Sequence, residues 1–267
     1  SQDSANAQAS RPAFAYALRL LQALSSEHGA LRWSSTGILQ LAANEAEAER
    51  QRNIVRDQAW PEEWLQFVEA EQAARLAGRE VRGPGWWLPA GAWVSPASLV
   101  TTVIARGGER IVHRTGQSVD HVERVGSGWH LLGARGKVIA DAPIVIVANA
   151  HRARYLVPGQ ALPLSAVRGQ VSDLPAHPSR ALHVAVSGNG YLAPTPGGGQ
   201  VAGASFVHDD EGLDLREAEH DDNLARAESM LPGFAQGLDA AALTGWAGVR
   251  ATVTDRLPVF GESTAQG

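Results

Sequence analysis

The stretch Gly245-Trp-Ala-Gly-Val-Arg-Ala-Thr-Val-Thr-Asp-Arg-Leu-Pro-Val-Phe-Gly261 predicts a β-strand that ends in a turn. Arg250 lies within its run of strand-forming residues. A guanidinium is permanently charged and presents a planar fork of N–H donors, so it can hold a carboxylate through two parallel hydrogen bonds. Two interpretations stay open: Arg250 binds the carboxylate of a ligand, or it pairs with a neighbouring Asp or Glu on an exposed strand.

The composition indicates a globular chain. Its 267 residues suffice for one large or two modest domains with a hydrophobic core, and 44% of them are hydrophobic. No stretch approaches the roughly 18 to 20 apolar residues of a membrane-spanning helix. The first ten residues lack the layout of a signal peptide. The sequence therefore predicts a soluble cytoplasmic protein that makes no use of a membrane.

Cysteine and charge exclude several classes of protein. The absence of cysteine rules out disulfides, thiolate metal sites and a cysteine nucleophile. A formal net charge of −5 argues against a chain that coats nucleic acid through a basic face. Lys137 is the only lysine, so any local basic patch consists of arginine. No Gly-x-Ser-x-Gly elbow marks a hydrolase.

The first half of the chain predicts helices separated by short strands. Asn44, and Ser95 followed by Pro96, are typical helix starts. We expect helices over 12–25, from 44 onward, over 61–76 and over 95–104, with strand character at 31–41 on either side of Gly37.

The second half predicts short strands and one further helix. Segments rich in β-branched residues and bounded by Gly or Pro are expected at 110–113, 118–124, 129–132, 137–139, 143–148, 162–174, 181–187, 191–194 and 201–207. Aspartates are expected to cap a helix over 221–231.

Two repeated triplets, His208-Asp-Asp210 and His220-Asp-Asp222, raise the question of a divalent ion. Both lie beside an expected turn or helix start, where aspartate favours capping. We therefore interpret them as exposed residues that cap a turn or a helix, and we predict that they bind no metal ion.

The last motif of the chain resembles the closing motif of FAD-dependent amine and amino-acid oxidases, the group that contains glycine oxidase, sarcosine oxidase and D-amino-acid oxidase. The resemblance rests on Gly248-Val-Arg250, Thr252, Asp255, Leu257-Pro258 and Gly261. Further segments, in the family's order, are similar to the oxidoreductase half of the bifunctional proteins that synthesise 5-methylaminomethyl-2-thiouridine in tRNA. They are Trp93-Val-Ser-Pro-Ala-Ser-Leu99, Ile146-Val-Ala-Asn-Ala-His151, Leu162-Pro-Leu-Ser-Ala-Val-Arg-Gly-Gln-Val171, Gly190-Tyr-Leu-Ala-Pro194 and Gly203-Ala-Ser-Phe206.

The resemblance implies a D-amino-acid oxidase-like fold, of the α+β or α/β class. In this fold, part of an FAD/NAD(P)-binding domain is interleaved with a substrate domain built on a mostly antiparallel sheet. We expect helices and substrate-domain strands in 1–108, a piece of the FAD-binding domain in 109–155, the substrate domain in 156–250, and a return toward the FAD-binding domain in 251–267.

The same resemblance assigns residues to the FAD cofactor. The position of Val119 lines the adenine pocket in the family, and Ala148-Asn149-Ala150 passes beside the dinucleotide. The family often has glycine where Ala150 stands. Gly261, at the end of the closing motif, is assigned to the cofactor as well.

A dinucleotide fingerprint is missing from the chain. No strict Gly-x-Gly-x-x-Gly occurs, and the looser Gly197-Gly-Gly-Gln-Val-Ala202 leads into a strand and is interpreted as a hairpin turn. In the resembled family the fingerprint precedes the first helix, and a further flavin-contacting segment follows the position of Gly261. The resemblance therefore predicts a fragment that binds FAD weakly or not at all, whereas the intact protein binds FAD.

Three residues are candidates for the catalytic site. By resemblance, Arg250 clamps the substrate carboxylate, and Tyr191 places its hydroxyl against the same group. Gln170 is a weaker candidate for lining the cavity. From the residues alone, a tyrosine in a half-buried strand can equally serve packing.

By the same resemblance, the intact enzyme oxidises the carboxymethylaminomethyl group of the tRNA wobble uridine, with tRNA as substrate and a fused methyltransferase domain upstream. Two alternatives stay open: an oxidase of a free small amino acid such as glycine or sarcosine, and a non-catalytic module that binds tRNA or a partner enzyme.

Overall fold

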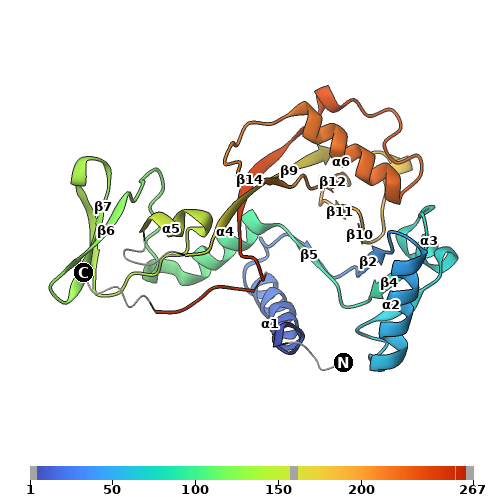
Figure 1. Ribbon diagram of the computed structural model, residues 1–267, viewed down its shortest axis with the longest axis horizontal. Helices are drawn as coiled ribbons and strands as arrows, with labels where there is room; N and C mark the ends of the chain where they lie inside the picture. The colour runs from blue at the N-terminus through green and yellow to red at the C-terminus, as the bar shows by residue number, and fades with distance from the viewer. Residues whose placement is uncertain (1–4, 157–161, 256, 263–267) are drawn as a thin grey trace. The chain divides into compact units, whose positions relative to one another are not determined.

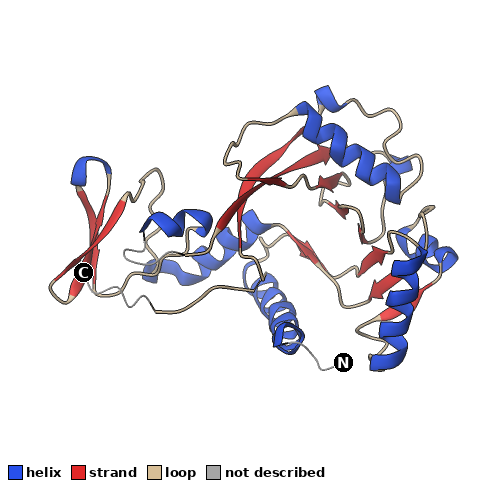
Figure 2. Ribbon diagram, viewed as in Figure 1, coloured by secondary structure: helices blue, strands red, loops and turns tan. Residues whose placement is uncertain are grey.

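The structure is a computed structural model that describes residues 5–156, 162–255 and 257–262. The chain divides into two compact units. Unit 1 comprises Ser1–Gly108, Gly169–Phe206 and Leu213–Ala247, and unit 2 comprises Glu109–Arg168, Val207–Gly212 and Gly248–Gly267. The chain contains both helices and strands, with most of the strands of its second half following one another, as Figures 1 and 2 show. This is the mixed architecture that the sequence predicts.

The main sheet has nine strands among the described residues, in the order β13-β9-β12-β11-β10-β2-β4-β3, with β14 also paired to β9. Neighbours are antiparallel from β13 to β11, between β11 and β10, and from β2 to β3, while β10 and β2 run parallel. The sheet is therefore mostly antiparallel, as expected. Its strands are β2 (Ile38–Leu41), β3 (Gln66–Val68), β4 (Gly85–Leu88), β9 (Ser165–Leu174), β10 (Ala185–Ser187), β11 (Tyr191–Pro194), β12 (Gln200–Gly203), β13 (Val207–His208) and β14 (Thr244–Thr252).

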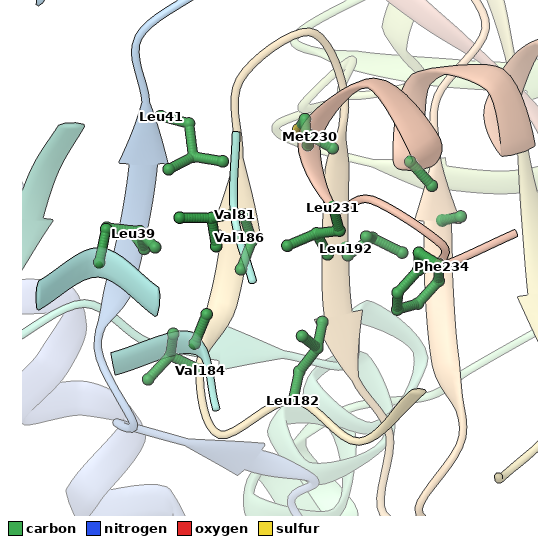
Figure 3. Close-up of a cluster of buried hydrophobic side chains, with 14 of the residues drawn as sticks. Leu39, Leu41, Val81, Leu182, Val184, Val186, Leu192, Met230, Leu231 and Phe234 are labelled. Atoms are coloured by element: carbon green, nitrogen blue, oxygen red, sulfur yellow. The ribbon is translucent and has the colours of Figure 1, made fainter. Parts of the chain in front are cut away.

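One face of this sheet is filled by the hydrophobic core of unit 1. Because side chains alternate along a strand, every second residue points to this face. Leu39, Val186 and Leu192 have no exposed area and belong to the same buried cluster as Leu231 and Phe234, as Figure 3 shows. Two helices cover this face: α3 (Ala70–Ala77) contacts β2 and β4, and α6 (Glu217–Met230) contacts β11 and β12.

The opposite face is covered at one end by α2 (Glu45–Gln58), which contacts β3 and β4. Trp86 of β4 points to this side, and its indole Nε1 donates a hydrogen bond of 3.0 Å to the backbone oxygen of Gln51. Its neighbour Trp87 packs against the core on the other side. The aromatic pair therefore holds helices to both faces of the same strand.

The remaining helices of unit 1 form a separate small cluster. The helices α1 (Ala5–His28) and α4 (Pro96–Gly107) contact each other, and Leu21, Leu24 and Leu31 form its buried centre. The short strands β1 (Trp33–Ser34) and β5 (Trp93–Val94) pair antiparallel beside it.

Unit 2 contains a three-stranded antiparallel sheet of β6 (His121–Val125), β7 (Gly128–Leu132) and β8 (Val138–Ala142). Gly126 supplies the positive φ of 59° that the turn between β6 and β7 requires. The short helix α5 (Ala153–Leu156) contacts β6.

Two helix starts predicted from local sequence are confirmed, whereas the helix expected over 12–25 begins earlier, since α1 spans Ala5–His28 with Pro12 inside it. Asn44 caps α2, because its side-chain oxygen accepts a hydrogen bond of 2.9 Å from the backbone of Glu47. Ser95 caps α4 in the same way through Ser98, and Pro96 takes the first helical position.

The expected helix over 61–76 is wrong. Gln66–Val68 form β3, and α3 begins only at Ala70. Phe67 and Val68 lie opposite Trp86 and Gly85 of β4, so sheet pairing overrides the helical spacing of the apolar residues.

The strands expected at 110–113 and 143–148 are also absent from the described chain. Ile144 and Ile146 are 76% and 85% exposed. A strand needs a hydrogen-bonded neighbour, and none of the described strands pairs with these segments.

Candidate functional site

A row of residues crosses the main sheet on the face opposite α6. Directly paired residues point to the same side of a sheet. Gln40 pairs with Ser187, Ser187 with Tyr191, Tyr191 with Gly203, and Gly203 with Val171. Their neighbours along the strands belong to the buried core. We call Gln40, Ser187 and Tyr191 the polar row. All of it lies in unit 1.

Tyr191, one of the predicted catalytic residues, is 38% exposed and lies at the end of the polar row. Its ring covers Gly203, because a Cβ at that glycine would stand 2.9 Å from both Cζ and the hydroxyl oxygen of Tyr191. The missing side chain at position 203 therefore makes room for the tyrosine ring.

Gln170, the second candidate from unit 1, lies on the other side of the sheet with α6. Its Nε2 donates to the backbone oxygen of Arg216 at 2.8 Å, and its Oε1 accepts from the backbone nitrogen of Arg216 at 2.8 Å. The side chain is fully buried. The structure therefore does not bring Gln170 together with Tyr191.

The predicted start of the last helix is wrong, and the contact between Gln170 and the backbone of Arg216 explains why. α6 begins at Glu217 after Arg216, which makes no side-chain cap, so Asp221 and Asp222 lie inside the helix and do not cap it. The helix starts earlier because Gln170 satisfies the backbone of Arg216 in place of a cap.

Further buried polar groups join β9 to α6. Ser172 Oγ lies 2.7 Å from His220 Nδ1, and Asn223 Nδ2 donates to Ser172 Oγ at 3.1 Å. Asn223 also donates to the backbone oxygen of Gln170 at 3.0 Å. The expectation that His220 is an exposed residue beside a cap is wrong, since only 3% of it is exposed.

Burial lowers the pKa of His220, and the negative charges of Glu219, Asp173 and Asp221 oppose this effect. The folded protein therefore favours the neutral imidazole. The unfolded chain binds a proton below about pH 6.5, the ordinary histidine value, while the folded state binds it only at lower pH. The stability that His220 contributes is complete above that pH and is lost as the pH falls through the lowered pKa.

We expect His220→Gln to reduce the loss in free energy of unfolding that occurs as the pH falls. The measurement is the free energy of unfolding from urea titrations between pH 7.5 and pH 5. The wild type should lose stability over this range by more than the variant does. The exposed His121 serves as control, and His121→Gln should keep the wild-type slope. An identical slope in His220→Gln would contradict the assignment.

Arg250 lies exposed on β14, in the part of that strand that belongs to unit 2. The five residues assigned to the cofactor also belong to unit 2. Val119 is half-buried in the loop before β6, and the others are exposed: Ala148, Asn149, Ala150 and Gly261.

The segment around Ala150 has an unusual backbone. Ala150 adopts a φ of 55°, in the left-handed region that favours glycine. It begins the 3-10 turn Ala150–Arg152. Behind it, Glu211 lies 3.2 Å from His151 Nε2 and 3.0 Å from Arg154 Nη2, which ties this turn to the loop at 207–212.

We expect Ala150→Gly to raise the free energy of unfolding by about 1 kcal/mol, because glycine removes the steric cost of the left-handed conformation. The matched control is Ala153→Gly, where φ is −55° and the same change should destabilise the protein by about 0.5–1 kcal/mol. Urea titration of both variants measures the difference. Equal effects at the two positions would refute the role of backbone conformation.

The described helices give a test for a dinucleotide cofactor. A pyrophosphate needs free backbone N–H groups at a helix start without negative charge. α2, α3 and α6 carry glutamate in their first turns, and the start of α4 is occupied by Ser95 and Pro96. These four helices therefore do not fit a pyrophosphate. The exposed segment 148–150 is open to a ligand.

The glycine-rich segment 197–202 is a hairpin turn, as predicted. It joins β11 to β12, and the backbone nitrogen of Thr195 donates to the oxygen of Gly199 at 3.0 Å.

The described residues contain no group of three or more His, Asp or Glu side chains arranged to hold a metal ion. The same residues form no helix with the length and apolar character needed to cross a bilayer.

The family described as "FAD dependent oxidoreductase" matches residues 2–267. The chain belongs to this family. It is 37% identical over 264 residues to the tRNA 5-methylaminomethyl-2-thiouridine biosynthesis bifunctional protein MnmC of Paraburkholderia xenovorans, covering 97% of this chain and 40% of the relative. The protein of the same name from Aromatoleum aromaticum is 38% identical over 270 residues, covering 98% and 41%. The chain thus spans about 40% of the length of these relatives.

Solved structures support the fold. Glycine oxidase from Geobacillus kaustophilus superposes with a TM-score of 0.81 at 21% identity, covering 99% of this chain and 72% of that one. L-proline dehydrogenase from P. horikoshii gives 0.76 at 16% identity, covering 93% and 69%. The predicted D-amino-acid oxidase-like fold is confirmed.

Sequence reasoning did not single out Gln40 and Ser187. Each alternates with a hydrophobic residue in a short strand. This alternation indicates that its side chain lies on the face of the sheet opposite the core. Their proximity to Tyr191 depends on the register between β2, β10 and β11, which no local pattern reveals.

Proposed function

We propose that the chain forms the FAD-dependent oxidoreductase part of an enzyme that modifies the tRNA wobble uridine. In this proposal, the glycine-derived carboxymethyl part of 5-carboxymethylaminomethyl(-2-thio)uridine is removed oxidatively as glyoxylate, leaving the aminomethyl uridine. The observation that carries it is the 37–38% identity, over nearly the whole chain, to proteins named for this biosynthesis. A fused upstream methyltransferase domain, tRNA as the substrate and a cytoplasmic location belong to the same proposal.

The chain's own residues bind and orient the substrate. Arg250 holds the carboxylate through its planar fork of donors, and the Tyr191 hydroxyl donates a further hydrogen bond to the same group. Fixing the carboxylate at two points limits the rotation of the adjacent Cα, which presents its hydrogen in one direction. When bound, FAD supplies the acceptor for the electrons removed from the substrate.

Gln170 takes a positioning role in this proposal. Its amide is engaged by the backbone of Arg216 and fixes the start of α6 on β9. This contact holds α6 against the face of the sheet that lies opposite Tyr191.

We expect Arg250→Ala, in the full-length FAD-loaded protein, to lower kcat/KM for modified tRNA about tenfold or more. A charge-assisted hydrogen bond contributes about 1.5–3 kcal/mol, and about 1.4 kcal/mol corresponds to tenfold in rate. Arg250→Lys keeps the charge but loses the fork, so it should rescue activity only in part. The measurement is steady-state release of glyoxylate.

A matched control is Arg124→Ala, an exposed arginine on β6 whose guanidinium lies 5.5 Å from the centre of the Trp129 ring. It should leave kcat/KM unchanged. An Arg250→Ala variant with wild-type kcat/KM would remove Arg250 from the substrate site.

For the cofactor, the proposal is that Val119, Ala148, Asn149, Ala150 and Gly261 contact FAD in the intact protein, and that the 267-residue chain alone binds FAD weakly or not at all. The support is the poor fit of four helix starts to a pyrophosphate.

We expect the isolated chain to elute from gel filtration without a flavin absorption band after incubation with excess FAD, because these helix starts offer no free anion site. Titration followed by flavin fluorescence measures the remaining affinity. Stoichiometric FAD that survives gel filtration would contradict the expectation.

The fold similarity to a glycine oxidase favours one alternative, an oxidase of a free small amino acid. Parallel assays of the full-length protein with modified tRNA, glycine and sarcosine separate the two functions. Turnover of the free amino acids alone would replace the tRNA proposal, and tRNA binding without any turnover would favour a non-catalytic module.

A further inference from the structure

Two members of the polar row, Gln40 and Ser187, are half-buried and thus partly accessible. Within the described residues, the side chains of these two make no hydrogen bond. A half-buried amide and hydroxyl without partners gain hydrogen bonds when a ligand supplies complementary groups.

The neighbours of the row across the sheet include aromatic residues. Trp86 pairs with Gln40 on the side away from Ser187, and Phe67 pairs with Trp86 in turn. At the other end, the ring of Tyr191 covers Gly203 and reaches Val171. Aromatic residues therefore bound the row at both ends, with Trp86 held against α2 by its bond to the backbone of Gln51.

The separation of Gln40 and Tyr191 matches a substrate that has a carboxylate at one end and a uracil ring at the other. Neighbouring strands lie about 4.8 Å apart, so Gln40 and Tyr191 are separated by two spacings, roughly 9.5 Å. In the proposed function Tyr191 contacts the carboxylate. A methylene–amino–methylene linker joins that carboxylate to the uracil ring, which lets the ring lie toward Ser187 and Gln40.

We propose that Gln40, assisted by Ser187, binds the edge of the uracil ring and determines the specificity for a uridine-linked substrate. The amide of Gln40 accepts from N3–H of the base and donates to its O4, and the Ser187 hydroxyl adds a further contact to the ring edge. A glutamine amide carries the donor and the acceptor that this edge requires, and it pairs with adenine in a comparable two-bond arrangement. The inference rests on the proposed function, because it assigns Tyr191 to the carboxylate.

The test uses the full-length FAD-loaded protein and two substrates, modified tRNA and sarcosine, which carries the carboxylate and amine but no base. Gln40→Leu should lower kcat/KM for modified tRNA at least about tenfold. Ser187→Ala should lower it less, and kcat/KM for sarcosine should stay unchanged in both. Free uridine should inhibit the wild type competitively, whereas 3-methyluridine, which lacks the N3–H donor, should not. The Gln40→Leu variant should lose inhibition by uridine.

Gln72→Leu is the matched control, an exposed glutamine on α3, which covers the other face of the sheet. It should match the wild type with both substrates. Ser187→Ala changes little volume and therefore keeps the test informative if Gln40→Leu unfolds.

The outcomes separate the inference from the proposed function. Modified tRNA oxidised equally well by the wild type, Gln40→Leu and Ser187→Ala would overturn the inference and leave the proposed function intact. Failure of the wild type to oxidise modified tRNA would overturn the proposed function. Equilibrium dialysis with uridine then tests the row by itself: binding that disappears in Gln40→Leu supports it, and absence of binding by the wild type refutes it.

Discussion

The side-chain amide of Gln170 bonds to both the backbone nitrogen and the backbone oxygen of Arg216, and much of unit 1 depends on this contact. It fixes where α6 begins and holds the helix over β9. From that start, Leu224, Ala227 and Met230 reach the core between the helix and the sheet. Because a buried amide is costly to leave unpaired, the contact favours one position of the helix over neighbouring ones.

The constraint also decides which face of the sheet stays accessible. With α6 and α3 on one side, the residues at alternate strand positions are fully enclosed. Their neighbours, the polar row, lie on the opposite side, where α2 contacts β3 and β4. A residue in one of these strands therefore faces either the buried core or the side where a ligand can bind. The position of α6 determines which of the two faces is buried.

Local signals in the sequence were sufficient at three places where the stabilising partner is close in the chain. The caps at Asn44 and Ser95, and the hairpin at 197–199, involve partners within four residues. The start of α6 could not be predicted, because the group that satisfies Arg216 stands 46 positions earlier. Phe67 was placed in a helix for a similar reason, since its partner Trp86 belongs to another strand. In the site, Tyr191 was found by motif, while Gln40 and Ser187 required the register of three strands.

Gly203 limits the substitutions that this part of the sheet can accept during evolution. The ring of Tyr191 and Cγ1 of Val171 occupy the space that a side chain at position 203 would need, all at 2.9 Å from its Cβ. A larger residue at 203 therefore requires smaller ones at both 191 and 171, and a chain that keeps the tyrosine must keep the glycine. Sequences that share the fold but bind a different ligand can exchange these three residues together, so the trio marks a point where recognition can change without rebuilding the sheet.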